Sequence, residues 1–185
     1  MTREEALILV KENIKNERII WHCLASEAVM RALAIRLNED PEKWAMAGLL
    51  HDLDVEITNA DPKVHGLHTV EMLEGKDIDP EIIDAIKHHN EDAEGIGPRS
   101  TVFQHALAAG ETITGLIQAT TYVYPDRKIA SVKSSSVVKR MKEKAFAASV
   151  KRESIRECEL IGIPLNEFAE ISVNAMRGIA DQIGL

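Results

Sequence analysis

The chain has few aromatic residues, although it has enough apolar residues to form a core. Aromatic residues make up 4% of its 185 residues, whereas hydrophobic residues make up 45%. Aliphatic side chains on good helix formers favour helices over a sheet, which usually draws on aromatic and β-branched residues. The length suits one domain that buries a core of its own. We therefore expect a single all-α domain.

The chain also has little cysteine and no long apolar run. Two cysteines, Cys23 and Cys158, are too few for a disulfide framework and make a reducing cytosol the simplest setting. No apolar segment is long enough for a signal peptide or a membrane span. The net charge of −8 argues against general nucleic-acid binding. We expect a cytoplasmic protein without a membrane partner, and its oligomeric state stays open.

Helix-start signals divide the chain into a series of helices. Capping residues or an Asp-Pro pair mark most of the starts. They predict helices over about 2–16, 17–37, 40–51, 61–73, 79–89 and 100–121, with Asp61-Pro62 opening the fourth helix and Ser100 capping the sixth. The only β-like run is Thr120–Tyr124, which Pro125 ends. We predict eight or nine helices in one domain spanning 1–185, with a metal-binding core over about 18–120 and a basic helical extension over about 127–185.

One stretch, 44–54, combines a buried helix with metal-binding residue types. It reads WAMAGLLHDLD, and Trp44, Ala47, Gly48 and His51 share the helix face that points to the core. An imidazole beside the Asp52 carboxylate is costly at a buried position unless something binds both. A divalent metal suits this pair of ligand types.

Further inward polar residues recur on successive predicted helices. They are His22, His51 with Asp52, His65, the pair His88-His89, and Glu111. Helix bundles build metal sites from side chains that project inward from facing helices. The pattern therefore predicts one or two divalent metal ions, whose identity the residues leave open.

This order of His, His-Asp, His, His-His and an acid resembles the HD-domain superfamily of metal-dependent phosphohydrolases, and most closely its small HDIG-type members. The metal motif covers about Trp21–Ala119, and Ser134–Ala147 also resembles the tail of that subgroup. The resemblance implies an HD-domain helical fold and two metal sites. It implies His22, His51, Asp52 and Glu111 as ligands of the first metal, His65 and His88 with bridging Asp52 for the second, and His89 near the substrate phosphate or a further metal.

The sequence departs from the family pattern in two places. Leu53-Asp54 replaces the usual Ile-Gly after His-Asp, and Glu111 replaces the usual aspartate. Because glutamate is longer, Glu111 either ligates from a helix that sits farther back or binds through water. His68 lies one helical turn from His65 and is the alternative ligand there, whereas His105 is expected to be structural.

These ligands favour hydrolysis of a nucleotide or other small phosphoester by metal-activated water. Asp52 would be catalytic, with Asp54 or His89 as proton-transfer groups. The chain has no G-x-S-x-G motif that would supply a serine nucleophile. Two alternatives stay open: an HD-fold di-iron oxygenase, and a catalytically weak nucleotide-binding sensor.

A basic segment follows the metal motif. Residues 127–156 hold ten Lys and Arg against Glu143 and Glu153, so the segment carries +8 and the rest of the chain −16. Such a segment attracts anions, although a solvated helix face is the ordinary reason for a charge run. We expect Lys133, Lys139 and Arg140 to bind the phosphate of a small phosphorylated substrate.

Overall fold

The protein is entirely helical in a computed structural model that describes all residues, 1–185. Nine α-helices and three short 3-10 helices are present, and no strand. In chain order they are α1 (Arg3–Asn13), α2 (Glu17–Leu37), α3 (Pro41–Leu50), α4 (Leu67–Leu73), α5 (Pro80–His89), α6 (Val102–Tyr122), η1 (Ile129–Ser131), α7 (Ser134–Arg140), α8 (Arg152–Arg156), η2 (Glu157–Glu159), α9 (Leu165–Arg177) and η3 (Ala180–Gln182). The predicted fold class and number of helices are confirmed.

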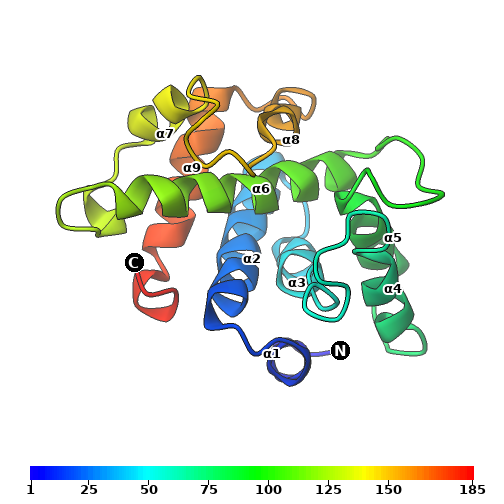
Figure 1. Cartoon of the computed structure of the whole chain (residues 1–185). Helices are drawn as coiled ribbons and strands as arrows, with labels where there is room; N and C mark the ends of the chain where they lie inside the picture. The colour runs from blue at the N-terminus through cyan, green and yellow to red at the C-terminus, as the bar shows by residue number, and fades with distance from the viewer.

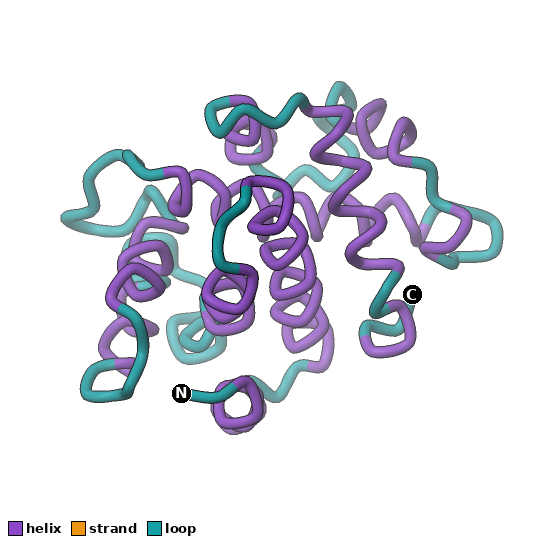
Figure 2. Tube along the Cα trace, turned by 180° about the vertical axis from the view of Figure 1, so that it is seen from behind, coloured by secondary structure: helices purple, strands orange, loops and turns teal.

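Helix α6 crosses the whole molecule, and most of the other helices pack against it (Figure 1). In this view α1, α3, α4 and α5 lie on one side of α6, α7 and α8 lie on the other, and α2 and α9 cross it. The view from behind shows the same arrangement with turns and loops joining the helices (Figure 2). A single cluster of 38 buried hydrophobic residues forms the core. None of these helices combines the length and the hydrophobicity that a membrane span requires.

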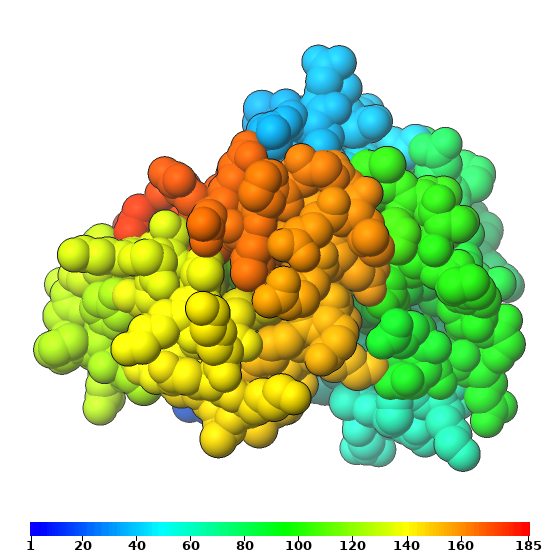
Figure 3. Space-filling model, turned by 90° about the horizontal axis from the view of Figure 1, so that it is seen from above, coloured from blue at the N-terminus to red at the C-terminus, as the bar shows by residue number.

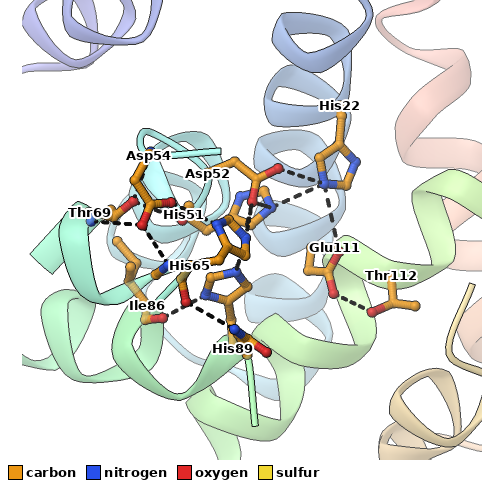
Figure 4. Close-up of polar contacts among 12 residues, drawn as sticks. His22, His51, Asp52, Asp54, His65, Thr69, Ile86, His89, Glu111 and Thr112 are labelled. Atoms are coloured by element: carbon orange, nitrogen blue, oxygen red, sulfur yellow. Dashed lines mark hydrogen bonds and ion pairs between the residues drawn. The ribbon is translucent and has the colours of Figure 1, made fainter. Parts of the chain in front are cut away.

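A glycine brings α2 and α3 into close contact. A Cβ added to Gly48 of α3 would lie 2.6 Å from the backbone oxygen of Ser26 in α2. Only a residue without a side chain permits this approach. The contact sets the end of α3, with His51, beside the His22 face of α2 (Figure 4).

The predicted helix over 61–73 is wrong in its first part. Residues 62–66 form turns, and α4 begins only at Leu67. Gly66, the N-cap residue, has φ +89°, a left-handed conformation that excludes a continuous helix through this position. His65 therefore lies on a turn rather than on a helix.

The ends of α6 also differ from the prediction. Thr101 is the N-cap residue rather than Ser100, and its side chain forms a capping box with Gln104. At the other end, α6 continues through the β-like run as far as Tyr122. The hydroxyls of Thr120 and Thr121 donate to helix carbonyls four residues earlier, at 2.7 and 2.9 Å, so these β-branched residues are accommodated in the helix.

Candidate metal centre

Five segments of the chain bring histidines and carboxylates together where α2, α3, α5 and α6 meet (Figure 4). Two of the histidines sit at helix ends, where the backbone turns away and the side chains point into the cluster. The residues are His22 of α2, His51 and Asp52 at the end of α3, His65 before α4, His89 at the end of α5, and Glu111 of α6.

Two imidazoles are held by backbone carbonyls. His51 Nδ1 lies 2.9 Å from the carbonyl oxygen of Gly48, and His89 Nδ1 lies 2.7 Å from that of Ile86. A carbonyl oxygen only accepts hydrogen bonds, so both Nδ1 atoms carry the proton and donate. Each Nε2 therefore presents a lone pair.

The other two imidazoles are held by side chains, and in these rings too Nδ1 carries the proton and donates. The Thr114 hydroxyl donates its hydrogen to the carbonyl oxygen of Glu111 at 2.7 Å. It therefore accepts from His22 Nδ1 at 2.8 Å. His65 Nδ1 donates to the Asp54 carboxylate at 2.7 Å. In all four histidines Nδ1 faces outward and Nε2 faces the cluster.

The Nε2 atoms meet in two pairs. His22 and His51 approach to 3.1 Å through their Nε2 atoms, and so do His65 and His89. Two lone pairs at this distance repel unless a proton or a metal ion lies between them, and neutral imidazole nitrogen is a common metal ligand. The donor set therefore fits a metal cation at each pair.

Asp52 lies between the two pairs. Its Oδ1 is 3.3 Å from His51 Nε2 and 3.1 Å from His65 Nε2, and its Oδ2 is 3.6 Å from His22 Nε2. Ligand atoms within 4.8 Å of one another form two groups, His22–His51–Asp52 and Asp52–His65–His89. One carboxylate is thus shared by two groups that could each hold an ion.

The surroundings favour neutral His51 and His89 and an ionised Asp52. Burial lowers the pKa of His51 to about 4 and that of His89 to about 3. Burial opposes ionisation of Asp52, but the neighbouring His51, His65 and His22 hold its pKa well below the usual value. Burial also acts to lower the pKa of His65, yet hydrogen bonds to Asp52 and Asp54 raise it to about 10. The carboxylates thus favour positive charge beside His65 Nε2, as a metal ion would supply.

The comparison with protein families agrees with this geometry. The family model of the HD domain matches residues 19–121, somewhat more than half of the chain. The chain belongs to the HD-domain family. Members of this superfamily are metal-dependent phosphohydrolases, and the matched range contains every residue of the metal centre. Comparisons with curated proteins and with solved structures give no match, and the HDIG-type subgroup stays a prediction.

In this HD domain Asp54 supports His65 from behind. Its side chain is fully buried, and Oδ2 accepts from the backbone N–H of Gly66 at 2.7 Å and of Thr69 at 3.2 Å. Its other oxygen accepts from His65. Both oxygens are engaged by the protein, so this placement indicates a residue that positions His65 rather than the predicted proton-transfer group. Gly66 completes the arrangement, because an added Cβ would lie 2.9 Å from the His89 ring.

Of the histidine pair at the end of α5, His89 rather than His88 joins the cluster. Successive helix residues point about 100° apart, so the pair cannot share one face. His88 Nδ1 lies 2.8 Å from the Asp84 carbonyl oxygen and 3.2 Å from the Gln104 amide. The structure places His89, and not the predicted His88, among the residues that could hold a metal ion. His68 is exposed and pairs with Glu71.

Glu111 lies beside the first group, His22–His51–Asp52, but is not one of its members. Its Oε2 lies 3.6 Å from His22 Nε2, and the Thr112 hydroxyl donates to its other oxygen. Burial raises the pKa of Glu111 to about 8, and the nearby Asp52 charge adds to the effect. This placement leaves both predicted modes for Glu111 open, direct ligation and binding through water.

A pocket of about 300 Å³ opens onto the metal centre. Its lining includes His22, Asp52, His65, His89 and Glu111 from the cluster, Asn90, Glu91, Thr112 and Gly115 around it, and Ser149, Val150, Lys151 and Ser154 from the C-terminal extension. Sequence reasoning missed the last group. Lys151 was counted in the basic segment, but no motif marked it as closer to the site than its neighbours.

The predicted phosphate-binding residues do not line this pocket. Lys133 and Lys139 are exposed. Arg140 pairs with Glu143 and lies over the Phe146 ring, 4.3 Å from its centroid. Helix α7 packs near the C-terminal end of α6 (Figure 1), so these side chains are surface residues rather than part of the pocket.

Proposed function

We propose that this HD-domain protein hydrolyses phosphomonoesters with the aid of two divalent metal ions. The observation that carries the proposal is the set of two imidazole pairs, each with Nε2 atoms 3.1 Å apart, on either side of Asp52. Bound divalent ions would supply an activated water at neutral pH and stabilise the charge of the transferring phosphoryl group.

The residues of the chain have distinct roles in this proposal. His22, His51 and Asp52 hold the first ion, and Asp52, His65 and His89 hold the second. The mixture of imidazole and carboxylate ligands suits several divalent first-row metals. Glu111 completes the first site, directly or through water.

The orienting contacts are part of the site. Thr114 fixes the His22 ring, and Asp54 fixes the His65 ring. Partners of this kind set the tautomer and the ring orientation of metal-ligating histidines. The four imidazoles are therefore positioned before an ion arrives, which lowers the cost of assembling the site.

Metal analysis of purified variants, coupled to phosphate release, tests the proposal. We expect Asp52→Ala to lose both ions, His89→Ala to lose the second ion, and both to lose hydrolysis. His88→Ala is the matched control, because its ring lies outside the cluster, and it should keep metal and activity. Chelation should abolish phosphate release, and a divalent metal should restore it.

Two results would contradict the proposal. One is normal metal content in Asp52→Ala. The other is bound iron with oxygen consumption and no phosphate release from any phosphomonoester, the result expected of an HD-fold oxygenase. A nucleotide-binding sensor would instead bind nucleotides without turnover.

A further inference from the structure

Most of the residues that line the pocket are polar or charged. Val150 is the only hydrophobic residue in its lining, and no Phe, Tyr or Trp is present. Ser149 and Ser154 belong to this lining, and their hydroxyls make no hydrogen bond within the protein. A ligand in this pocket therefore meets mainly hydroxyl, carboxylate, ammonium and imidazole side chains, and no Phe, Tyr or Trp.

This chemistry disfavours a nucleobase. Proteins commonly hold bases by stacking them on aromatic side chains. The volume of about 300 Å³ lies at the lower end of the roughly 300–1,000 Å³ that ligand pockets span. The phosphoryl group must also occupy part of this space, beside the metal centre. The hydroxyl and charged side chains around it suit a hydroxylated group.

Lys151 is the only Lys or Arg in the pocket lining. It lies in the extension before α8, and its Nζ forms an ion pair with Asp92 and lies 3.8 Å from Glu91 in the loop after α5. Its side chain is about half exposed. An exposed ion pair of this kind contributes little to stability. Replacing Asp92 by a phosphate dianion as the partner of Lys151 therefore costs little.

The backbone that carries Lys151 is held in place by its neighbour Arg152. The Arg152 guanidinium donates to the carbonyl oxygens of Ala147 at 2.6 Å, Val150 at 2.7 Å and Phe146. These bonds fold the segment before α8 so that it overhangs α6; the yellow and orange segments cover this face in the view from above (Figure 3). The Lys151 backbone is therefore fixed, whereas its half-exposed side chain can turn its ammonium group away from Asp92.

We infer that the substrate is the phosphate monoester of a small polyhydroxylated alcohol, such as a sugar phosphate, and not a nucleotide. Lys151 leaves Asp92 to bind the phosphate, and the Ser149 and Ser154 hydroxyls bind hydroxyls of the substrate. This inference rests on the proposed hydrolase function and adds the substrate class and the residues that select it.

A matched substrate pair tests the class. Ribose 5-phosphate and adenosine 5′-monophosphate share the phosphate and the ribose and differ by the base. We expect kcat/KM to be at least about tenfold higher for ribose 5-phosphate, because the base has no aromatic stacking partner in the lining. Equal or better turnover of the nucleotide would overturn the inference and leave the hydrolase function intact. Phosphate release from neither compound, with any divalent metal, would overturn both.

Substitution of Lys151 tests its role. Lys151→Gln should raise KM for ribose 5-phosphate about tenfold with little change in kcat, because a charge-assisted bond to the phosphate is lost. Titration calorimetry of the metal-loaded protein with inorganic phosphate should show a similar loss of affinity. Lys144→Gln, an exposed lysine outside the pocket lining, is the control and should match the wild type. Unchanged KM and phosphate affinity in Lys151→Gln would overturn the assignment.

Discussion

Asp54 shows how a single carboxylate can orient a candidate metal ligand. It occupies a position where the HDIG-type pattern has glycine, and it accepts hydrogen bonds from His65, Gly66 and Thr69. A carboxylate behind a ligating histidine fixes the tautomer and makes the imidazole a stronger donor to metal. The second group of ligands thus has an orienting charge that the first group, oriented by the Thr114 hydroxyl, does not have.

Replacing Asp54 by asparagine tests this role. The amide keeps the shape but removes the charge, and it turns an N–H donor toward at least one of three donors. We expect the affinity of the second metal site to fall about 10- to 100-fold while the first site is retained. Metal titration by calorimetry measures both sites. Asp61→Asn is the control, because Asp61 is an exposed residue in the same segment between α3 and α4. Loss of both ions in Asp54→Asn, or of neither ion, would contradict the assignment.

The sequence patterns indicated which residue types form the site. They did not indicate which side chain of a neighbouring pair faces it, or which contacts orient it. His51 was expected to face the core, and it is fully buried. The sequence could not separate His88 from His89, because adjacent residues differ only by helix phase, which an error of one residue in register reverses. The role of Asp54 had no signal, since its three donors come from a turn whose backbone course the sequence does not specify.

At the scale of elements, the close contact of α2 and α3 brings His22 and His51 together. The approach depends on Gly48, whose added Cβ would meet backbone atoms of Ser26. Backbone cannot move aside as a side chain can. By contrast, an added Cβ at Gly110 of α6 would meet the flexible end of Met30, with 2.9 Å between Cβ and Sδ.

These two glycines form a matched pair for a stability experiment. We expect Gly48→Ala to lower the free energy of unfolding by about 1–3 kcal/mol or more, because overpacking separates the helices. Gly110→Ala should change it little, since Met30 can shift and alanine favours a helix by about 1 kcal/mol over glycine. Urea unfolding followed by circular dichroism measures both. Equal effects of the two substitutions would show that the α2–α3 approach is not a tight constraint.

Helix starts were largely predictable because their caps are local. The Thr2–Glu5 capping box and the starts at Pro41 and Pro80 are where the sequence indicated. The start of α4 was placed too early because Asp61-Pro62 resembles the two Asp-Pro starts. The left-handed backbone of Gly66, which ends the turns there, follows from its approach to His89 and not from local sequence.

For the molecule as a whole, Arg99 and Glu157 join the HD domain to its C-terminal extension. The Arg99 side chain is 4% exposed and donates from Nε to Glu157 at 2.7 Å. Its Nη1 donates to the carbonyl oxygens of His88 at 2.9 Å and His89 at 3.3 Å, at the end of α5. A cation at a helix C-terminus also interacts favourably with the helix dipole. Glu157 lies outside the range 19–121 that the family model matches, so a residue of the extension supports the backbone of a candidate metal ligand.

The last prediction follows from this buried ion pair. Glu157→Leu leaves Arg99 without its main partner and should lower the free energy of unfolding by roughly 3–5 kcal/mol. Because the Arg99 contact to the end of α5 is then disturbed, the second metal site should weaken as well. Added metal should therefore raise the melting temperature less than in the wild type. Glu159→Leu removes an exposed carboxylate two residues away and is the control. A melting temperature and a metal-induced shift that both match the control would show that the extension does not support the metal centre.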